Sequence, residues 1–211
     1  RQEFTANVSH ELKTPLTAIS GYSELIQNGM TNEEETIRFA GEIHKSAKRL
    51  LTLINDTIRL SQLDTSEQKV IYEAIDLYKI AEDCVNMLKF SAENHGITIS
   101  IHGTNAYLEG NKEMLEEVVY NLCDNAIRYN NEGGKVDVTV KPVKGKIYLC
   151  VEDNGIGISK EHQERIFERF YRVDKSRSKS TGGTGLGLAI VKHIIQQHGA
   201  HMELTSEKGK G

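Results

Sequence analysis

Near its N-terminus the sequence carries a histidine, His10, whose neighbours could make it a nucleophile. In a helix Val8 and Leu12 share an apolar side, and His10 lies about 200° from Val8, so its imidazole points away from that side. Glu11 flanks the imidazole with a carboxylate, and Thr14, four residues on, shares its face. An exposed imidazole beside a carboxylate can act as a nucleophile, although an inert surface histidine fits the same pattern.

Pro15 should make this helix deformable beside the histidine. Proline carries no N–H, so Pro15 leaves the carbonyl of Glu11 without its usual helical partner. We therefore expect a kink or a loosened turn next to His10.

A second set of polar residues lies on a predicted helix at 114–129. Asn121 and Asn125, at i and i+4, place two carboxamides on one line, although Asn is a poor residue for a helix interior. Amide oxygens can ligate Mg²⁺, a cation that keeps several waters and bridges phosphates. A polar stripe that merely faces solvent explains the same pair equally well.

The end of a predicted strand could recognise a purine base. The strand runs into Asp153, and Gly155 and Gly157 follow, where the backbone can take positive φ and approach a ligand closely. The carboxylate could accept a hydrogen bond from the exocyclic amine of adenine, whereas it would repel the carbonyl of guanine. A plain Asp-Asn-Gly turn remains the alternative.

Several glycines, at positions 182, 183, 185 and 187, precede or open a predicted helix. Backbone N–H groups at such a helix start form an anion site that suits a triphosphate. The sequence lacks the G-x-x-x-x-G-K-[ST] pattern of a Walker A loop and the signatures of Ser/Thr kinases. A Rossmann loop is also excluded, because no strand–turn–helix unit with a following acidic residue surrounds the glycines.

Two long amphipathic helices should support His10. Apolar residues at steps of three and four predict helices over 2–30 and 32–63, with Thr31 and Glu34 forming a capping box before the second. A hairpin of this length cannot bury both apolar stripes by itself. We expect a dimer that forms a four-helix bundle, with packing of the hairpin on its own C-terminal domain as the alternative.

After a polar linker at 64–69, the pattern changes to alternating strands and helices. Residues 174–183 are rich in Ser, Lys and Gly and are expected to be mobile. The pattern predicts an α/β sandwich, a mixed sheet with helices on one face. Its predicted strands are 70–75, 97–101, 136–140, 147–151 and 202–205, its turn is 131–134, and its helices are 76–93, 111–129, 161–167 and 184–197. Asp76 should cap the first of these helices, and Asn111 should start the second.

Composition excludes several classes of protein. The net charge of −4 over 211 residues gives no basic field for nucleic acid, and no apolar run approaches the length of a membrane span. Cys84, Cys123 and Cys150 form no C-x-x-C pair, which favours buried thiols in a reducing compartment. Because the sequence opens at Arg1, inside a helical pattern, we interpret it as part of a longer protein.

The motifs together resemble the catalytic core of two-component sensor histidine kinases. Residues 10–16 resemble the H box, 121–125 the N box, 153–157 the G1 box, 165–174 the F box and 183–187 the G2 box. Each motif alone is weak evidence for this family. All five motifs together, in the usual order and at the usual separations over nearly the whole chain, are very specific for it.

The resemblance implies a fold of class α + α/β. A dimerisation and histidine phosphotransfer domain at 1–66 would form the four-helix bundle. An ATP-binding sandwich of the Bergerat or GHKL type would occupy 67–211, with its final strand truncated.

The resemblance also assigns roles to individual residues. His10 would be phosphorylated, Glu11 would accept its proton, Thr14 would orient the water that dephosphorylates a partner, and Arg172 would help the γ-phosphate reach the histidine. Arg128 stands where the family often has Lys, which keeps the charge and changes its geometry. The implied metal ligand is Asn125, and the implied ATP-binding residues are Asn121, Asn125, Arg128, Tyr129, Asp153, Gly155, Gly157, Phe167, Gly183, Gly185, Leu186 and Gly187.

The cofactors implied are ATP and Mg²⁺, and the partners are a second copy of the chain and the receiver domain of a response regulator. The parent protein would be anchored in a cell membrane through segments absent here, with this portion in the cytoplasm. The rivals are a gyrase-like or chaperone-like GHKL ATPase, an anti-sigma-type Ser/Thr kinase and a scaffold that only binds nucleotide. An ATPase of that group needs a carboxylate where this chain has Asn121, and the Ser/Thr kinase lacks the histidine hairpin.

Overall fold

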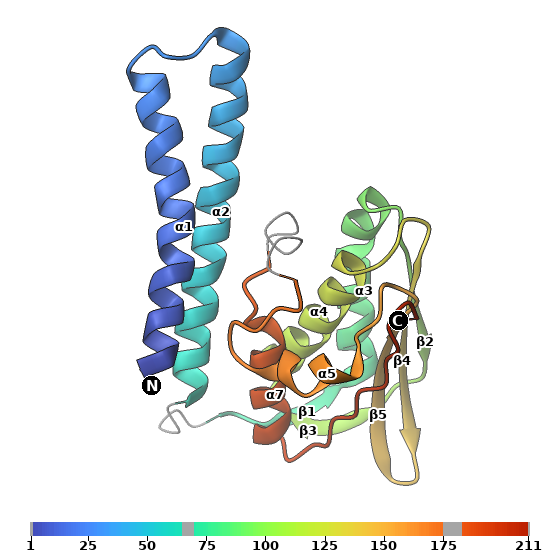
Figure 1. The fold of residues 1–211 in the computed structure, drawn as a ribbon. Coiled ribbons are helices and arrows are strands. Elements are labelled where there is room, and N and C mark those ends of the chain that lie inside the picture. Colours follow the sequence, from blue (N-terminus) through green and yellow to red (C-terminus); the bar gives the residue numbers. More distant parts are fainter. Residues whose placement is uncertain (1, 65–69, 175–182, 211) are drawn as a thin grey trace. The chain divides into compact units, whose positions relative to one another are not determined.

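The computed structural model describes residues 2–64, 70–174 and 183–210, which fall into two units (Figure 1). The hairpin unit comprises Arg1–Asp64 with Arg169–Leu186, and the sandwich unit comprises Thr65–Glu168 with Gly187–Gly211. The linker predicted at 64–69, beyond Asp64, and most of the segment predicted to be mobile lie outside the described residues. No helix in the described ranges combines the length and the apolar character needed to cross a membrane.

The hairpin is built from α1 (Gln2–Gln27) and α2 (Glu33–Asp64), which lie side by side in Figure 1. The sequence pattern predicts the first helix to residue 30, but α1 ends at Gln27. Gly29 adopts a left-handed φ of 67°, and Met30 N–H donates to the carbonyl of Leu25 at 3.0 Å, a hydrogen bond that closes the helix end. The ring of Tyr22 on α1 packs against Phe39 on α2 with centroids 4.9 Å apart.

The capping box predicted at Thr31 and Glu34 is wrong by one position. The backbone N–H of Glu35 donates to Asn32 Oδ1 at 2.8 Å, and the N–H of Asn32 donates to Glu35 Oε2 at 3.1 Å. Asn32 is therefore the cap, because its amide oxygen reaches the open N–H groups of the first turn. The Thr31 hydroxyl instead shares a hydrogen bond with that of Thr36.

The hairpin keeps many large apolar side chains exposed in the single chain. They come from both helices and from the turn between them. The hairpin thus leaves part of both apolar stripes uncovered, in agreement with the expectation that it cannot bury them by itself. The exposed side chains are Leu16, Leu25, Met30, Ile37, Leu51, Ile54 and Ile58.

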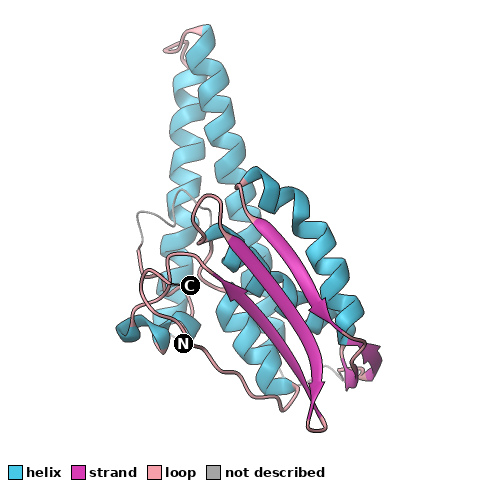
Figure 2. Cartoon of the chain, turned by 90° about the vertical axis from the view of Figure 1, so that its right-hand side faces the viewer, coloured by secondary structure: helices cyan, strands magenta, loops and turns pink. Residues whose placement is uncertain are grey.

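The sandwich unit contains the predicted mixed sheet with helices on one face (Figure 2). Strands β2 (Thr98–Gly103) and β4 (Lys135–Val143) run parallel, and β5 (Lys146–Asp153) pairs antiparallel with β4. Two helices, α3 (Leu77–Asn94) and α4 (Lys112–Arg128), pack on this sheet.

The alternation of β4 places Val136, Val138 and Val140 in the core, each fully buried. Such a half-buried strand is what a two-residue period predicts. Side chains from α3 and α4 complete this core. Two of them are the thiols of Cys84 and Cys123, whose pKa values burial raises to about 11 and about 12. At neutral pH both thiols are therefore protonated, apolar core groups.

A small second sheet joins β1 (Glu73–Asp76) to β3 (Tyr107–Gly110). Asp76 ends β1 and caps α3, as predicted, accepting hydrogen bonds from the N–H groups of Tyr78 at 3.1 Å and Ala106 at 2.9 Å. Burial alone would raise the pKa of Asp76, but these hydrogen bonds and one from Asn105 outweigh it and hold the pKa below its usual value. Asn111, predicted to start the next helix, is the cap of α4.

Several predicted elements differ from the structure. The helix predicted at 161–167 is split into α5 (Lys160–Gln163) and a 3-10 turn, η1 (Arg165–Phe167). The helix predicted from Thr184 begins later, as α7 (Gly187–Gln197), because Gly185 takes a left-handed φ of 75°.

The prediction of a strand at 202–205 is wrong. A strand exists through its hydrogen bonds to a neighbour, and these residues pair with no strand in the part of the chain described. The nearest pairing is an isolated bridge between Glu207 and Lys210. The sequence analysis also missed β3, whose four residues give too short a pattern to identify.

Candidate active site

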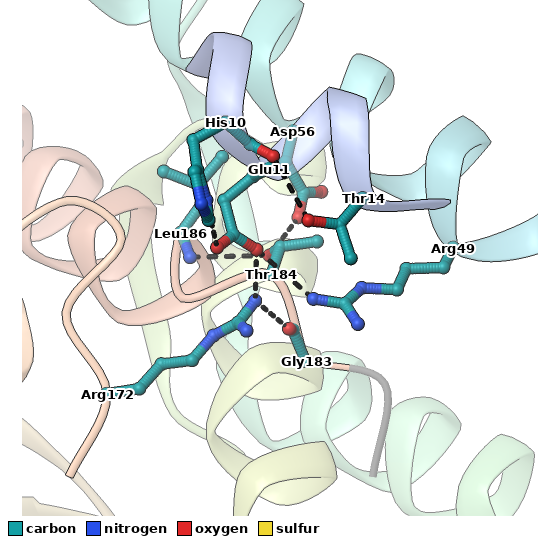
Figure 3. Close-up of polar contacts among 9 residues, drawn as sticks. All are labelled: His10, Glu11, Thr14, Arg49, Asp56, Arg172, Gly183, Thr184 and Leu186. Atoms are coloured by element: carbon teal, nitrogen blue, oxygen red, sulfur yellow. Dashed lines mark hydrogen bonds and ion pairs between the residues drawn. The ribbon is translucent and has the colours of Figure 1, made fainter. Parts of the chain in front are cut away.

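The structure places His10 on the exposed face of α1, as the spacing predicts. Its side chain is 81% exposed, and its Nδ1 lies 3.9 Å from Oε1 of Glu11 (Figure 3). Thr14 donates from its hydroxyl to the carbonyl of His10 at 3.3 Å. The helix continues through Pro15 without ending, so the predicted kink stays a prediction.

The carboxylate of Glu11 is held on its other oxygen by two arginines. Arg49 of α2 donates from a terminal nitrogen to Oε2 at 3.1 Å, and Arg172 approaches the same oxygen at 3.4 Å (Figure 3). The Arg49 and Arg172 side chains are only 16% and 7% exposed, and that of Glu11 is 24% exposed. Glu11 and Arg172 have predicted roles, but no motif in the sequence indicates Arg49, which lies thirty-eight positions from Glu11.

Residues 183–186 are tied to α2 within the hairpin unit. The buried hydroxyl of Thr184 donates to Oδ2 of Asp56 at 2.6 Å and accepts from the N–H of Leu186 at 3.3 Å. Arg172 donates to the carbonyl of Gly183. The sequence analysis did not identify Thr184 or Asp56 as site residues, because their contact joins positions far apart in the chain.

A backbone hydrogen bond joins Phe170 to Gly185 within the hairpin unit, and Phe170 has an unusual backbone conformation there. Phe170 has a positive φ of 64°, rare for a bulky residue, and its N–H donates to the carbonyl of Gly185 at 2.9 Å. A side chain on Gly185 would come within 3.1 Å of the Phe170 backbone. Such strain persists only where the surrounding contacts enforce it. Arg169 adds one such contact, an ion pair with Asp64 at 2.7 Å.

In the sandwich unit the predicted ATP-binding residues gather around α4. Asn121 and Asn125 share one line of this helix, and Asn121 donates to the carbonyl of Glu117 at 2.9 Å. Both side chains are half-buried. Arg128 is paired with Asp124 at 2.6 Å, so a phosphate would have to share this guanidinium with a carboxylate.

The end of β5 lies against the C-terminal end of α4. The N–H of Gly155 donates to Oδ1 of Asp153 at 2.8 Å, and the N–H of Ile156 donates to the carbonyl of Tyr129 at 3.2 Å. A Cβ on Gly155 would lie 2.6 Å from that carbonyl. The structure thus brings Asp153, Gly155 and Tyr129 together, while their role toward adenine stays a prediction.

Gly157 has a structural reason for its identity. Its φ is 62°, and a Cβ there would lie 1.9 Å from the carbonyl of Glu207. The turn at 207–210 therefore packs directly on this glycine, while its role toward adenine stays a prediction.

Gly187 opens α7 where this helix packs on α4. A Cβ on Gly187 would lie 2.7 Å from Oδ1 of Asn121, so the helix start approaches the carboxamide closely. Phe167, in η1, lies on an element that also contacts α7. The other predicted residues of the glycine loop, Gly183, Gly185 and Leu186, belong to the hairpin unit.

The donor set fits Mg²⁺ of the kind that a nucleotide brings with it. Among the described residues, no three His, Cys, Asp or Glu side chains are grouped to hold a metal ion. Mg²⁺ bound to phosphates needs only one or two protein oxygens, and the side chain of Asn125 has no hydrogen-bond partner among the residues described here. Its amide oxygen can serve as such a ligand.

These features define the class of protein: a nucleotide-binding α/β sandwich on the same chain as a helical hairpin with an exposed histidine. Residues 1–66 match the family model of the "His Kinase A (phospho-acceptor) domain". Residues 110–211 match that of the "Histidine kinase-, DNA gyrase B-, and HSP90-like ATPase". The chain belongs to the two-component sensor histidine kinases.

Curated relatives carry the same family name. The chain is 41% identical over 212 residues to the sensor-like histidine kinase SenX3 of Mycolicibacterium smegmatis, covering 100% of this chain and 55% of the relative. It is 37% identical over 215 residues to the sensor histidine kinase WalK of Bacillus subtilis, covering 100% of this chain and 35% of the relative. The chain therefore spans only part of the length of these relatives.

Solved structures show the same fold. The Acinetobacter baumannii histidine kinase AdeS matches with a TM-score of 0.70 and 26% identity, covering 89% of this chain and 86% of that one. Full-length ShkA, solved in complex with AMPPNP, matches with a TM-score of 0.71 and 25% identity, covering 99% of this chain and 43% of that one.

Substitution of Gly187 tests whether the start of α7 belongs to the nucleotide site. In a Gly187→Ala variant the new methyl group must displace the Asn121 carboxamide, the flexible end of a side chain, so the fold should persist. We expect Mg-ATP affinity to fall about tenfold, which corresponds to about 1.4 kcal/mol. Isothermal titration calorimetry measures the loss.

Gly41→Ala is the matched control, because nothing lies within 4 Å of a Cβ at that helical position. Normal Mg-ATP affinity in a folded Gly187→Ala variant would remove this helix start from the site.

Proposed function

We propose that this chain is the kinase core of its parent protein and phosphorylates His10 with the γ-phosphoryl group of Mg-ATP. The observation that carries the proposal is the exposed imidazole with a carboxylate aimed at its Nδ1, on one chain with a GHKL-type sandwich. The phosphoryl group then passes to an aspartate of a response regulator, as expected for a sensor histidine kinase.

The geometry of Glu11 suggests how the transfer proceeds. With its proton on Nδ1, which faces Oε1 of Glu11, His10 attacks the γ-phosphorus through Nε2. The new N–P bond forms as the bond from phosphorus to the bridging oxygen breaks, and ADP leaves with the electron pair. The Nδ1 proton moves to Glu11, across a separation of 3.9 Å that must shorten in the reacting complex.

The sandwich unit binds and orients the nucleotide. Asp153 would accept a hydrogen bond from the adenine amine, the N–H groups at the start of α7 would donate to the phosphates, and the amide oxygen of Asn125 would ligate Mg²⁺. The ion neutralises charge on the phosphates when bound. Arg172 contributes a cation to the developing charge when it leaves Glu11, because transfer through a loose transition state depends on positioning and charge.

The exposed apolar stripes support a homodimer. Large apolar side chains are exposed on both helices of the hairpin, and their exposure to water is costly. Two hairpins packed on these stripes form the four-helix bundle of the His Kinase A type.

The parent protein is proposed to be a membrane-anchored sensor that presents this portion to the cytoplasm. The support is the name shared by its curated relatives, which are sensor kinases longer than this chain. Recovery of the full-length protein in the soluble fraction of its cell would contradict this placement.

Autophosphorylation is the direct test of the proposed reaction. Incubation with γ-labelled Mg-ATP should give a phosphoprotein that is labile in acid and stable in alkali, and His10→Ala should abolish it. Glu11→Gln should slow labelling by about 10²-fold or more, because a general base typically contributes this much. Gel autoradiography after acid or alkali treatment gives the readout.

His44→Ala removes another exposed histidine of the hairpin and should label normally. Label retained by His10→Ala protein would overturn the assignment of the acceptor. Release of the label as free phosphate without a phosphoprotein would favour an ATPase instead.

Thr14 is proposed to support a phosphatase activity, the hydrolysis of the phosphorylated response regulator. Its hydrogen bond to the His10 carbonyl is 3.3 Å long, against 2.9 Å for the bond from Thr17 to Lys13, so its hydroxyl is more easily released to orient water. A Thr14→Ala variant should lose phosphatase activity about tenfold or more while still labelling His10. The measurement is the decay of a phosphorylated regulator added to the protein.

Thr17→Ala is the matched control, since Thr17 is exposed on the same helix and makes the same kind of backbone bond. Unchanged decay with Thr14→Ala would refute the role.

Dimerisation is tested by mass in solution. Light scattering should give twice the mass of 23.6 kDa at micromolar concentration. Leu51→Glu, which places a charge on the exposed stripe, should yield monomers, whereas Lys45→Glu, at an exposed position about 120° from Leu51 around the helix, should not. A monomeric wild-type chain would be incompatible with the bundle.

A further inference from the structure

Arg49 reaches from α2 across the hairpin to the carboxylate beside the candidate acceptor. Its terminal nitrogen lies 3.1 Å from Oε2 of Glu11, within hydrogen-bond distance. Oε1 of the same carboxylate is the oxygen nearest to Nδ1 of His10. One carboxylate is thus shared, with the arginine on one oxygen and the imidazole on the other (Figure 3).

The burial of Arg49 shows that this contact is more than a surface ion pair. Its side chain is 16% exposed, whereas the neighbouring Lys45 and Lys48 of α2 are exposed. A guanidinium removed from water needs an anionic partner, and Glu11 supplies one through Oε2.

The two arginines on Glu11 differ in their freedom to leave. Arg49 and Glu11 belong to the two helices of one hairpin, so their separation is set by the packing of α1 on α2. Arg172 comes from another segment of the chain and also binds the carbonyl of Gly183. If Arg172 moves to a phosphate group, Arg49 remains to hold Oε2.

We infer that Arg49 is a positioning residue for phosphoryl transfer: it fixes Oε2 of Glu11 so that Oε1 faces Nδ1 of His10. The inference rests on the proposed function, in which Glu11 accepts the imidazole proton. Without Arg49 the carboxylate keeps Arg172 as its cationic partner, turns away from the imidazole and competes with the γ-phosphate for Arg172. Arg49 acts only through Glu11 and touches no reacting atom.

A double-mutant cycle tests the inference on the dimeric chain. Arg49→Met retains an apolar stem of similar reach and removes the guanidinium. We expect the maximal rate of His10 labelling to fall about tenfold or more, with KM for ATP within about twofold, because ATP binds to the other unit. Arg49→Lys should recover part of the rate, since its ammonium can still reach a carboxylate but without the fork.

The decisive measurement is the same change in a Glu11→Gln background. If Arg49 acts through Glu11, adding Arg49→Met to Glu11→Gln should slow labelling no further, so the effects are strongly non-additive. Independent effects that multiply would overturn the inference, because a merely structural role lowers the rate in either background. Lys45→Met removes the same charge from an exposed position on the same helix and should leave the rate unchanged.

The outcomes separate this inference from the function on which it rests. Full labelling by Glu11→Gln would remove the proton acceptor and with it the proposed proton transfer. Slow labelling by Glu11→Gln with full labelling by Arg49→Met would leave the proposed function standing and overturn the role of Arg49. If Arg49→Met fails to fold by circular dichroism, the cycle is run with Arg49→Lys, and additivity there overturns the inference equally.

Discussion

The chemistry of the hairpin unit depends on one carboxylate shared between cations and an imidazole. Glu11 meets Arg49 and Arg172 on Oε2, while Oε1 lies nearest to His10. Two nearly buried guanidinium groups thus converge on one oxygen of a single carboxylate. A triphosphate approaching His10 would compete with Glu11 for Arg172.

In the sandwich unit, close backbone approach has a comparable importance. The end of β5 and the start of α7 both reach α4 only because Gly155 and Gly187 carry no side chain. The contact at Gly155 brings Asp153 close to Tyr129 at the C-terminal end of α4, and the contact at Gly187 brings the start of α7 close to Asn121 further along the same helix. Glycines in this unit thus set the distances between polar groups, which explains why the loops, and not the strands, carry the most specific part of the sequence.

Local chemistry was well predicted from the sequence. Asp76 caps its helix as expected, and Asn111, the expected start of its helix, is the cap there, since a cap depends on a few adjacent residues. The cap at Thr31 was placed one residue early, because Thr31, Asn32 and the following glutamates offer two nearly equivalent boxes. The prediction of a strand at 202–205 is wrong for a different reason. It rests on the residue pattern of that segment alone, whereas a strand forms only by hydrogen bonding to a neighbouring strand.

Long-range contacts were beyond reach of the sequence. Arg49 and Asp56 lie on one amphipathic helix and in no motif, and nothing near them in the chain indicates Glu11 or Thr184 as a partner. The sequence motifs identify candidate site residues. The side chains that contact those residues come from distant positions and become neighbours only in the folded hairpin unit. The roles of the motif residues stay predictions, while their gathering around α4 and on α1 is seen directly.

The turn between α1 and α2 has a mechanical consequence. Hydrogen bonds close it on both sides, from Met30 to Leu25 at one helix end and between Asn32 and Glu35 at the other. Such a short, bonded connection has little slack, so the helices cannot slide or rotate independently at this end. A twist applied at the opposite end of α1 would therefore be concentrated near His10 and Pro15, where the helix lacks one backbone hydrogen bond. Such a twist would change the distance between Glu11 and Arg49.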